Sequence, residues 1–287
     1  MAKWLPFVVL AFLFTNTLVA EDEARRIWPE EYLKPPAKAQ RPPQIALKKA
    51  SAGYKVATPK VVLESVAADT VVGVTIWRLR PAATGDNAAP IEGENAKWIP
   101  ERVEANAPLT KGDRVRLSVE VAREGYLYVI NREQYRDGSV GEPYLIFPTL
   151  RLVKGDNHTA VGKVVEIPSQ SDNPPYFTLA PGRDDQVAEV ISVFVTPEPI
   201  NYLNITNEPL KMSAGQVAQW EKSWGKNVGR LEMVDGAGKP WTQAEKEAGM
   251  GTRLLKHEDP PPQTVFYNPD TRQGDPAFIN IDLRYQQ

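Results

Sequence analysis

Short runs of β-branched and aromatic residues alternate with turn residues between positions 61 and 200. In the run 114–121, valines and leucine alternate with polar residues, and this period of two predicts a strand with one face buried and one in solvent. The run 126–130 is apolar on both faces, which indicates a central strand. The run 187–195 predicts a longer strand that is buried on both sides except at Glu189 and Ser192. No amphipathic stretch of helical length separates these runs, so a parallel α/β sheet is not expected. The pattern predicts a mainly β protein, an antiparallel β-sandwich with a short helical C-terminal extension.

The extension, residues 201–287, contains two helix-start patterns, Ser213-Ala214-Gly215-Gln216 and Thr242-Gln243-Ala244-Glu245. In each of them we expect a capping box, in which the hydroxyl accepts from the third helical amide and the Gln or Glu side chain reaches back. Gly249 or Gly251 should end the second helix. Alternating apolar residues in 278–285 predict a final strand.

The first twenty residues have the layout of a secretory signal peptide: Lys3, an apolar run from Leu5 to Leu13, and Ala20 before the expected cut. A membrane anchor is the alternative, but the apolar run is shorter than the ~20 residues that a spanning helix needs. We therefore expect a mature chain that starts at Glu21 and is periplasmic or extracellular, with no later transmembrane segment.

Paired prolines in residues 21–60 predict a semi-rigid spacer, or alternatively a ligand for a partner's groove.

The composition excludes several kinds of chemistry. The chain has no cysteine, which rules out disulfides, thiolate metal sites and a lipoprotein anchor, and a net charge of −2 argues against a nucleic-acid partner. Its two histidines, His158 and His257, lie in polar turn sequences, and we expect both to be solvated rather than catalytic. The adjacent carboxylates Asp184-Asp185 and Glu30-Glu31 also read as solvated charge. No catalytic, cofactor or metal site is expected.

Several landmarks recur in a defined order along the middle of the chain: Gly112-Asp113, Gly125, Phe147-Pro148, Asn157 and Pro168. In order and spacing they resemble a bacterial family catalogued as domain of unknown function 4384, over residues from about 70 to 197. The resemblance implies a small β-sandwich of exported or envelope proteins, often appended to protease-like or kinase-like domains. No catalytic residues are established for that family, so none is carried over. The loop between Asn131 and Tyr144 is longer than the family's usual turn.

Two aromatic pairs are the candidate contacts with a partner or ligand. Tyr126 and Tyr128 fall on one strand face, where they can stack on a sugar or peptide or pack at the rim of the core. Trp220 and Trp224 share one helix face, as a partner anchor or as packing against the sandwich. The favoured hypothesis is a non-catalytic protein-interaction module of the cell envelope, with an unidentified envelope protein or glycan as partner. A carbohydrate- or peptidoglycan-binding module and a carboxylate-dependent hydrolase are the alternatives.

Overall fold

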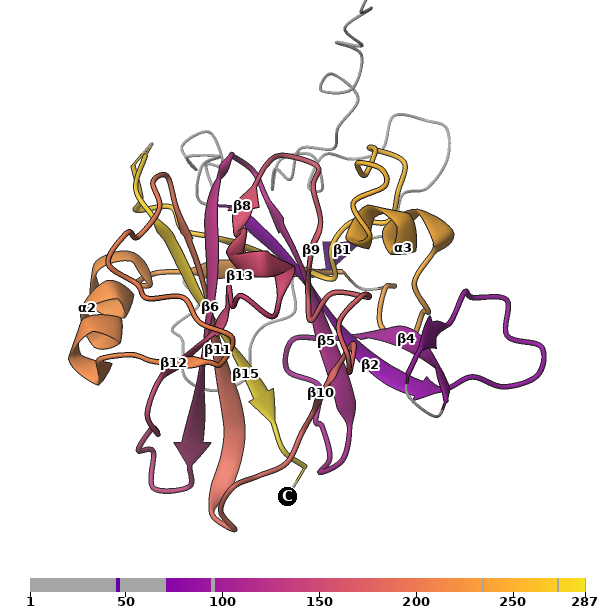
Figure 1. Ribbon diagram of the computed structural model, residues 1–287, viewed down its shortest axis with the longest axis horizontal. Helices are drawn as coiled ribbons and strands as arrows, with labels where there is room; N and C mark the ends of the chain where they lie inside the picture. Colours follow the sequence, from indigo (N-terminus) through magenta and orange to yellow (C-terminus); the bar gives the residue numbers. More distant parts are fainter. Residues whose placement is uncertain (1–44, 47–70, 94–95, 234, 273, 287) are drawn as a thin grey trace, which may run out of the picture.

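The computed structural model describes residues 45–46, 71–93, 96–233, 235–272 and 274–286. The expected signal peptide, residues 1–20, and the expected spacer, residues 21–60 apart from positions 45–46, lie outside these described residues. In the described part, strands form two antiparallel sheets that face each other (Figure 1), so the prediction of a mainly β sandwich is confirmed. No helix in this part has the length and apolar character needed to cross a bilayer.

The larger sheet, sheet A, has nine strands among the described residues: β1 (Ile45–Ala46), β2 (Val72–Pro81), β3 (Ile91–Glu92), β4 (Lys97–Val103), β5 (Arg114–Val121), β9 (Val165–Ile167), β10 (Phe177–Thr178), β13 (Gly229–Met233) and β14 (Thr264–Tyr267). The smaller sheet, sheet C, has six: β6 (Gly125–Tyr135), β7 (Tyr144–Phe147), β8 (His158–Thr159), β11 (Gln186–Thr196), β12 (Leu210–Lys211) and β15 (Ala277–Arg284).

The main core lies between the inner faces of the two sheets. Val119 of β5 and Val129 of β6 are both fully buried in it, as the alternation of their strands predicts. Strand β6 pairs with β7, β8 and β11, which confirms its central position, and it continues to Tyr135 rather than ending near residue 130. A turn at residues 136–139 follows it directly, with the Gly138 amide donating to the Tyr135 carbonyl at 2.9 Å.

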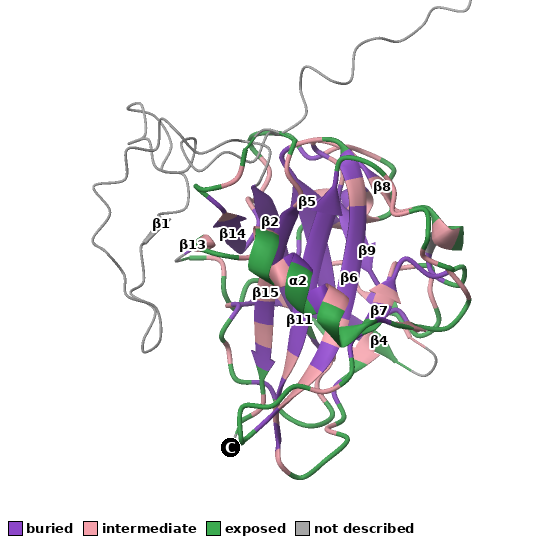
Figure 2. Cartoon of the chain, turned by 90° about the vertical axis from the view of Figure 1, so that its left-hand side faces the viewer, coloured by how far each residue is buried: buried purple, intermediate pink, exposed green. Residues whose placement is uncertain are grey.

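The residues after 200 complete the sandwich instead of following it. Strand β15 pairs with β11 over eight residues, and β14 inserts into sheet A beside β2. Helix α2 (Ala214–Trp224) lies against the outer face of sheet C, with its exposed side turned to solvent (Figure 2). Helix α3 (Gln243–Gly249) packs on the outer side of sheet A. The extension therefore supplies both strands and the covers of both outer faces.

One expectation about burial is wrong. The polar face of 114–121 was expected in solvent, but Arg116 is 0% exposed and Glu120 is 4% exposed. Both lie on the outer face of sheet A, and there α3 and the segment before it cover Arg116. Ser192 of β11 is also fully buried, beneath α2, where it donates to Asn280 at 2.7 Å. The alternation in the sequence therefore identified a face whose side chains have polar partners inside the protein. That face is not exposed to water.

The two expected capping boxes differ. Thr242 and Glu245 form both reciprocal hydrogen bonds at the start of α3, so that prediction is confirmed, and α3 ends at Gly249 as expected. At α2 the Ser213 hydroxyl accepts from the Gln216 amide at 3.4 Å, but the Gln216 side chain donates to the Tyr202 hydroxyl at 2.6 Å. The predicted second hydrogen bond of this capping box, from the Gln216 side chain back to the start of the helix, is therefore wrong. The Gln216 side chain finds its acceptor in Tyr202, outside the helix.

The landmark residues mostly shape the scaffold. Gly112 has a φ of +94° beside Asp113, whose carboxylate accepts from the Thr110 amide at 2.8 Å, which is a tight turn before β5. Pro148 and Pro168 directly follow the last residues of β7 and β9 and end these strands. Gly125 is needed because of a close approach and not because of its φ, which is not positive: an added Cβ would lie 2.6 Å from the Thr196 carbonyl oxygen of β11.

Candidate functional site

A half-open cleft of about 620 Å³ lies beside β9, and this volume is in the usual range for ligand pockets. Its walls come from four parts of the chain: the end of β7, the loop leading into β8, the segment around β9, and the turn after α3. Its lining residues are Phe147, Asp156, Asn157, His158, Lys163, Val164, Val165, Glu166, Ser169, Gln170, Ser171, Gly249, Met250, Gly251 and Thr252. Two landmark residues, Phe147 and Asn157, thus meet in one cleft.

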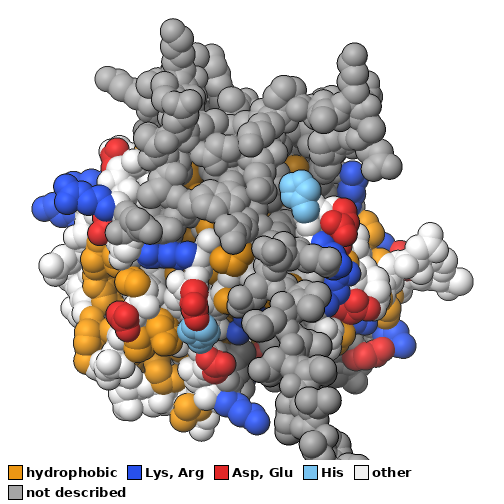
Figure 3. Space-filling model, turned by 90° about the horizontal axis from the view of Figure 1, so that it is seen from above, with side chains coloured by type: hydrophobic (Ala, Val, Ile, Leu, Met, Phe, Trp, Pro, Cys, Tyr) orange, Lys and Arg blue, Asp and Glu red, His pale blue; other side chains and the backbone are white. Residues whose placement is uncertain are grey.

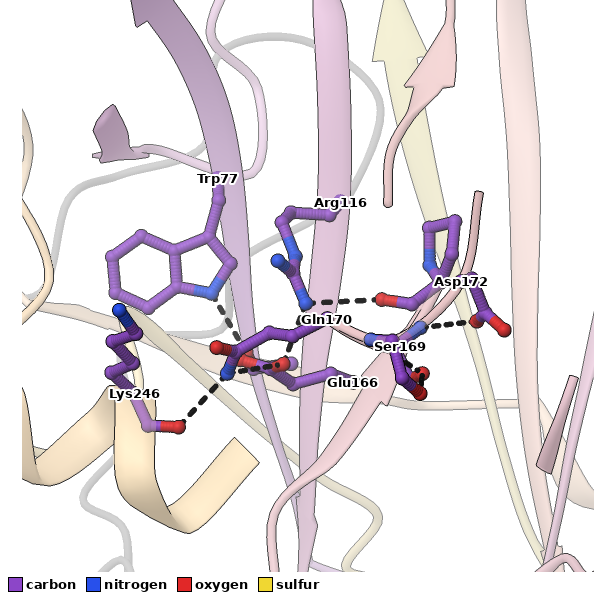
Figure 4. A network of polar contacts seen from close by, with 10 residues as sticks. Trp77, Arg116, Glu166, Ser169, Gln170, Asp172 and Lys246 are labelled. Atoms are coloured by element: carbon purple, nitrogen blue, oxygen red, sulfur yellow. Dashed lines mark hydrogen bonds and ion pairs between the residues drawn. The ribbon is translucent and has the colours of Figure 1, made fainter. Parts of the chain in front are cut away.

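A buried ion pair lies at one wall of the cleft (Figure 4). Arg116 Nη2 donates to Glu166 Oε2 at 2.5 Å and to the Pro168 carbonyl at 3.1 Å, and both charged side chains are almost fully buried. Gln170 Nε2 donates to the same Glu166 oxygen at 2.9 Å and to the Lys246 carbonyl of α3 at 2.8 Å. The network therefore ties β5, β9 and α3 together.

Burial raises the pKa of the Glu166 carboxyl above its ordinary value, and the Arg116 guanidinium opposes that rise. Gly249 packs directly against this carboxyl, so closely that an added Cβ there would clash with Glu166 Oε1. Arg116 also lies 5.6 Å from the centre of the Trp241 ring, a cation–π distance. Glu166 is thus held in place by Arg116, Gln170 and Gly249. This suits a residue that shapes the wall of the cleft.

The two tyrosines predicted as contacts have separate surroundings. Tyr128 is 4% exposed, and its hydroxyl accepts from the Ile200 amide at 2.8 Å, so it packs in the core beneath α2. Tyr126 is half-buried, with its ring 5.3 Å from the His158 ring in an edge-to-face arrangement. His158 Nε2 lies 2.9 Å from the Glu124 carboxylate. His158 is therefore engaged at the rim of the cleft, in β8 rather than in a turn.

The two tryptophans of α2 pack on sheet C. Trp220 is 9% exposed and stacks on Phe194 of β11 with 4.9 Å between ring centres. Trp224 is half-buried and stacks on the same ring at 5.5 Å. The shared helix face predicted from the sequence is present, and Phe194 occupies it.

Sequence reasoning missed a pair of facing carboxylates. Glu133 of β6 and Glu189 of β11 are directly opposite in register. Glu189 accepts from Asn131 at 3.0 Å, from Gln186 at 2.7 Å and from the Tyr285 hydroxyl at 3.0 Å, while Glu133 accepts from the Tyr135 hydroxyl. These residues are far apart in sequence, so only the β6–β11 register could have revealed the pair.

The Glu189 carboxyl should make stability depend on pH. Burial raises its pKa above the ordinary value, and the charge of Glu133 raises it further. A raised folded-state pKa gives stability that is fully present below the unfolded value of about 4.3 and is lost as pH rises through the folded value. Glu189→Gln does not titrate, so we expect it to exceed the parent in stability near pH 7 by up to about 1 kcal/mol, the size of a like-charge cross-strand effect.

Urea unfolding of both proteins between pH 4 and pH 8 measures this difference. The exposed residue Asp184 provides the matched control, since Asp184→Asn should run parallel to the parent at every pH. A stability difference between Glu189→Gln and the parent that is the same at pH 4 and pH 8 would contradict the assignment.

Among the residues that the structure describes, no three His, Asp or Glu side chains are grouped so that they could hold a metal ion. On the face seen from above, the visible charged side chains of both signs are interspersed among hydrophobic ones (Figure 3).

The chain matches no family model, no curated protein and no solved structure. The cleft and the chemistry of its walls are therefore the features that bear on function.

Proposed function

We propose that the protein is an exported, non-catalytic module of the cell envelope, periplasmic or extracellular, that binds a partner protein in the cleft beside β9. The observation that supports this most is the state of the one carboxylate buried at the cleft. Glu166 is neutralised by Arg116 and held by Gln170, so it presents no free acid or base. The remaining walls offer hydroxyls, amides and apolar side chains, together with Asp156, His158 and Lys163, each of which contacts a neighbouring group of the protein. Such a mixture can orient a bound ligand.

The hydrolase alternative would depend on Glu133 and Glu189. A glycosidase pair needs a substrate between its carboxyl groups. Here Glu189 is occupied by three hydrogen-bond donors, and an added Cβ at Gly182 would lie 2.8 Å from Glu133 Oε1, so the loop is packed onto the pair. The pair therefore favours a structural role over catalysis.

The carbohydrate alternative would depend on exposed aromatic faces. Phe147, the aromatic ring among the cleft residues, is 1% exposed and offers no face to a sugar. Half-buried Tyr126 stands at the rim against His158. A protein partner thus fits the cleft better than a glycan.

Crosslinking in the native host tests the proposal. A photoreactive residue at Ser171, which is exposed in the cleft, should capture a defined envelope protein, and the same residue at exposed Lys222 on α2 should not. Ser171→Trp, which fills the cleft, should abolish capture from a second cleft position, Thr252. Equal capture from Ser171 and Lys222, or turnover of an envelope substrate by the purified mature chain, would overturn the proposal.

Export itself gives a separate prediction. The arrangement of Lys3, the apolar run and Ala20 predicts cleavage after Ala20. Terminal sequencing of protein from the host's envelope fraction should find Glu21 as the first residue. Intact Met1 on protein from the cytoplasmic fraction would contradict export.

A further inference from the structure

Strand β9 forms a free edge of sheet A within the described residues. It pairs with β5 through Val165 and Ile167, opposite Val119 and Leu117. The pairing pattern fixes the direction of the backbone groups. The Ala122 amide donates to the Val71 carbonyl at 3.2 Å, so even-numbered residues of β5 bond to β2 and odd-numbered ones bond to β9.

It follows that the amide and carbonyl of Glu166 point away from β5. No described residue supplies a hydrogen-bond partner for either group. Glu166 is also a wall residue of the cleft, together with Val164 and Val165. The cleft therefore contains an unpaired donor and acceptor of a sheet edge, which is the template that an additional strand requires.

The side chains around this edge define what an added strand would carry. Val165 points to the inner side of the sandwich and lines the cleft with Phe147, which suits apolar residues at alternate positions of the ligand. Glu166 points to the outer side, where Gly249 packs against it, which leaves room only for a small residue opposite. The ligand strand should therefore carry an apolar, a small and an apolar side chain at three successive positions.

Charge defines the end of the ligand. In an antiparallel addition, the ligand's C-terminal end lies at the start of β9, next to Lys163. Lys163 Nζ donates to the His158 carbonyl at 2.7 Å, and an ammonium group has two further donors. The nearby Asp156 carboxylate is engaged in its own loop, where it accepts from the His158 amide at 3.0 Å.

We propose that the cleft binds the extended C-terminal segment of a partner protein as an extra antiparallel strand on β9, with its terminal carboxylate at Lys163. This inference rests on the proposed function, because it names the partner segment that the cleft takes. Strand addition gives affinity through main-chain hydrogen bonds, and the alternating side chains and the carboxylate give specificity.

The probe is the peptide acetyl-Val-Ser-Val-Thr with a free C-terminal carboxylate, titrated into the ¹⁵N-labelled mature protein. Its serine is placed opposite Glu166. We expect the Glu166 amide resonance to shift and its hydrogen exchange to slow. N-methylation of the serine removes the donor to the Glu166 carbonyl and should weaken binding at least tenfold. N-methylation of the next valine, whose amide points away from β9, is the matched control and should change binding far less.

The carboxylate has its own controls. Amidation of the peptide's C-terminus, or Lys163→Ala, should each weaken binding about fivefold, and combining them should add little. Equal binding of the two N-methylated peptides, or no effect of amidation, would overturn the inference. If chitotetraose binds in the cleft and no peptide does, strand addition fails while binding in the cleft stands. If neither probe binds and Ser171 captures nothing, the inference and the proposed function fail together.

Discussion

Arg116→Met should destabilise the protein by about 3–5 kcal/mol, because it leaves the buried Glu166 carboxylate without its counter-charge. Methionine keeps most of the length of the arginine side chain, so the loss reports charge rather than volume. Gln170 would remain as a hydrogen-bond donor to Glu166, but a neutral amide does not replace a guanidinium. Chemical unfolding at pH 7, followed by tryptophan fluorescence, measures the change.

The double variant Arg116→Met, Glu166→Gln should recover a large part of the loss, since no buried charge is then left. Acid should also reduce the deficit of the single variant. Without Arg116 the pKa of Glu166 rises further, and a protonated carboxyl needs no counter-charge, so the deficit should shrink as pH falls. Arg78→Met, at an exposed arginine of β2, should stay within about 0.5 kcal/mol of the parent. An Arg116→Met deficit as small as this would contradict the role of the pair.

The Arg116–Glu166 pair shows which features of the fold could be predicted from the sequence and which could not. Period two placed Val119 and Val129 inside correctly, because side chains alternate strictly along a strand. The same rule put Arg116 on the opposite face correctly but gave it the wrong surroundings. Whether that face meets water depends on what packs over it. The cover comes from α3, more than a hundred residues later, and no local pattern carries that information.

The candidate site follows the same logic. The landmark order brought attention to Phe147 and Asn157, and both line the cleft. The opposite wall, at Gly249 and the turn after it, belongs to a segment that was read only as a helix end. The Glu133–Glu189 pair was equally out of reach, because a strand register is set by long-range hydrogen bonds. The sequence therefore indicated which residues carry polar or aromatic side chains, but it did not show which distant residues come together in the fold.

Trp220→Ala should cost about 3–5 kcal/mol, because Trp220 is a buried anchor of α2 on sheet C. Its ring stacks on Phe194, and truncation would leave a cavity between the helix and β11 that the stacked Trp224 cannot fill without moving. The predicted loss is in the free energy of unfolding, measured by urea titration. Any loss of a partner by this variant should follow the fraction of unfolded protein.

Lys222→Ala is the matched control on the same helix, since Lys222 is exposed and should change stability by less than about 0.5 kcal/mol. The comparison separates the two roles that were open for the tryptophan pair. A packing residue loses stability first and binding second, while a partner anchor loses binding with its stability intact. If Trp220→Ala unfolds with the parent and yet loses the captured envelope protein, α2 is the contact surface, and the partner does not bind through the cleft alone.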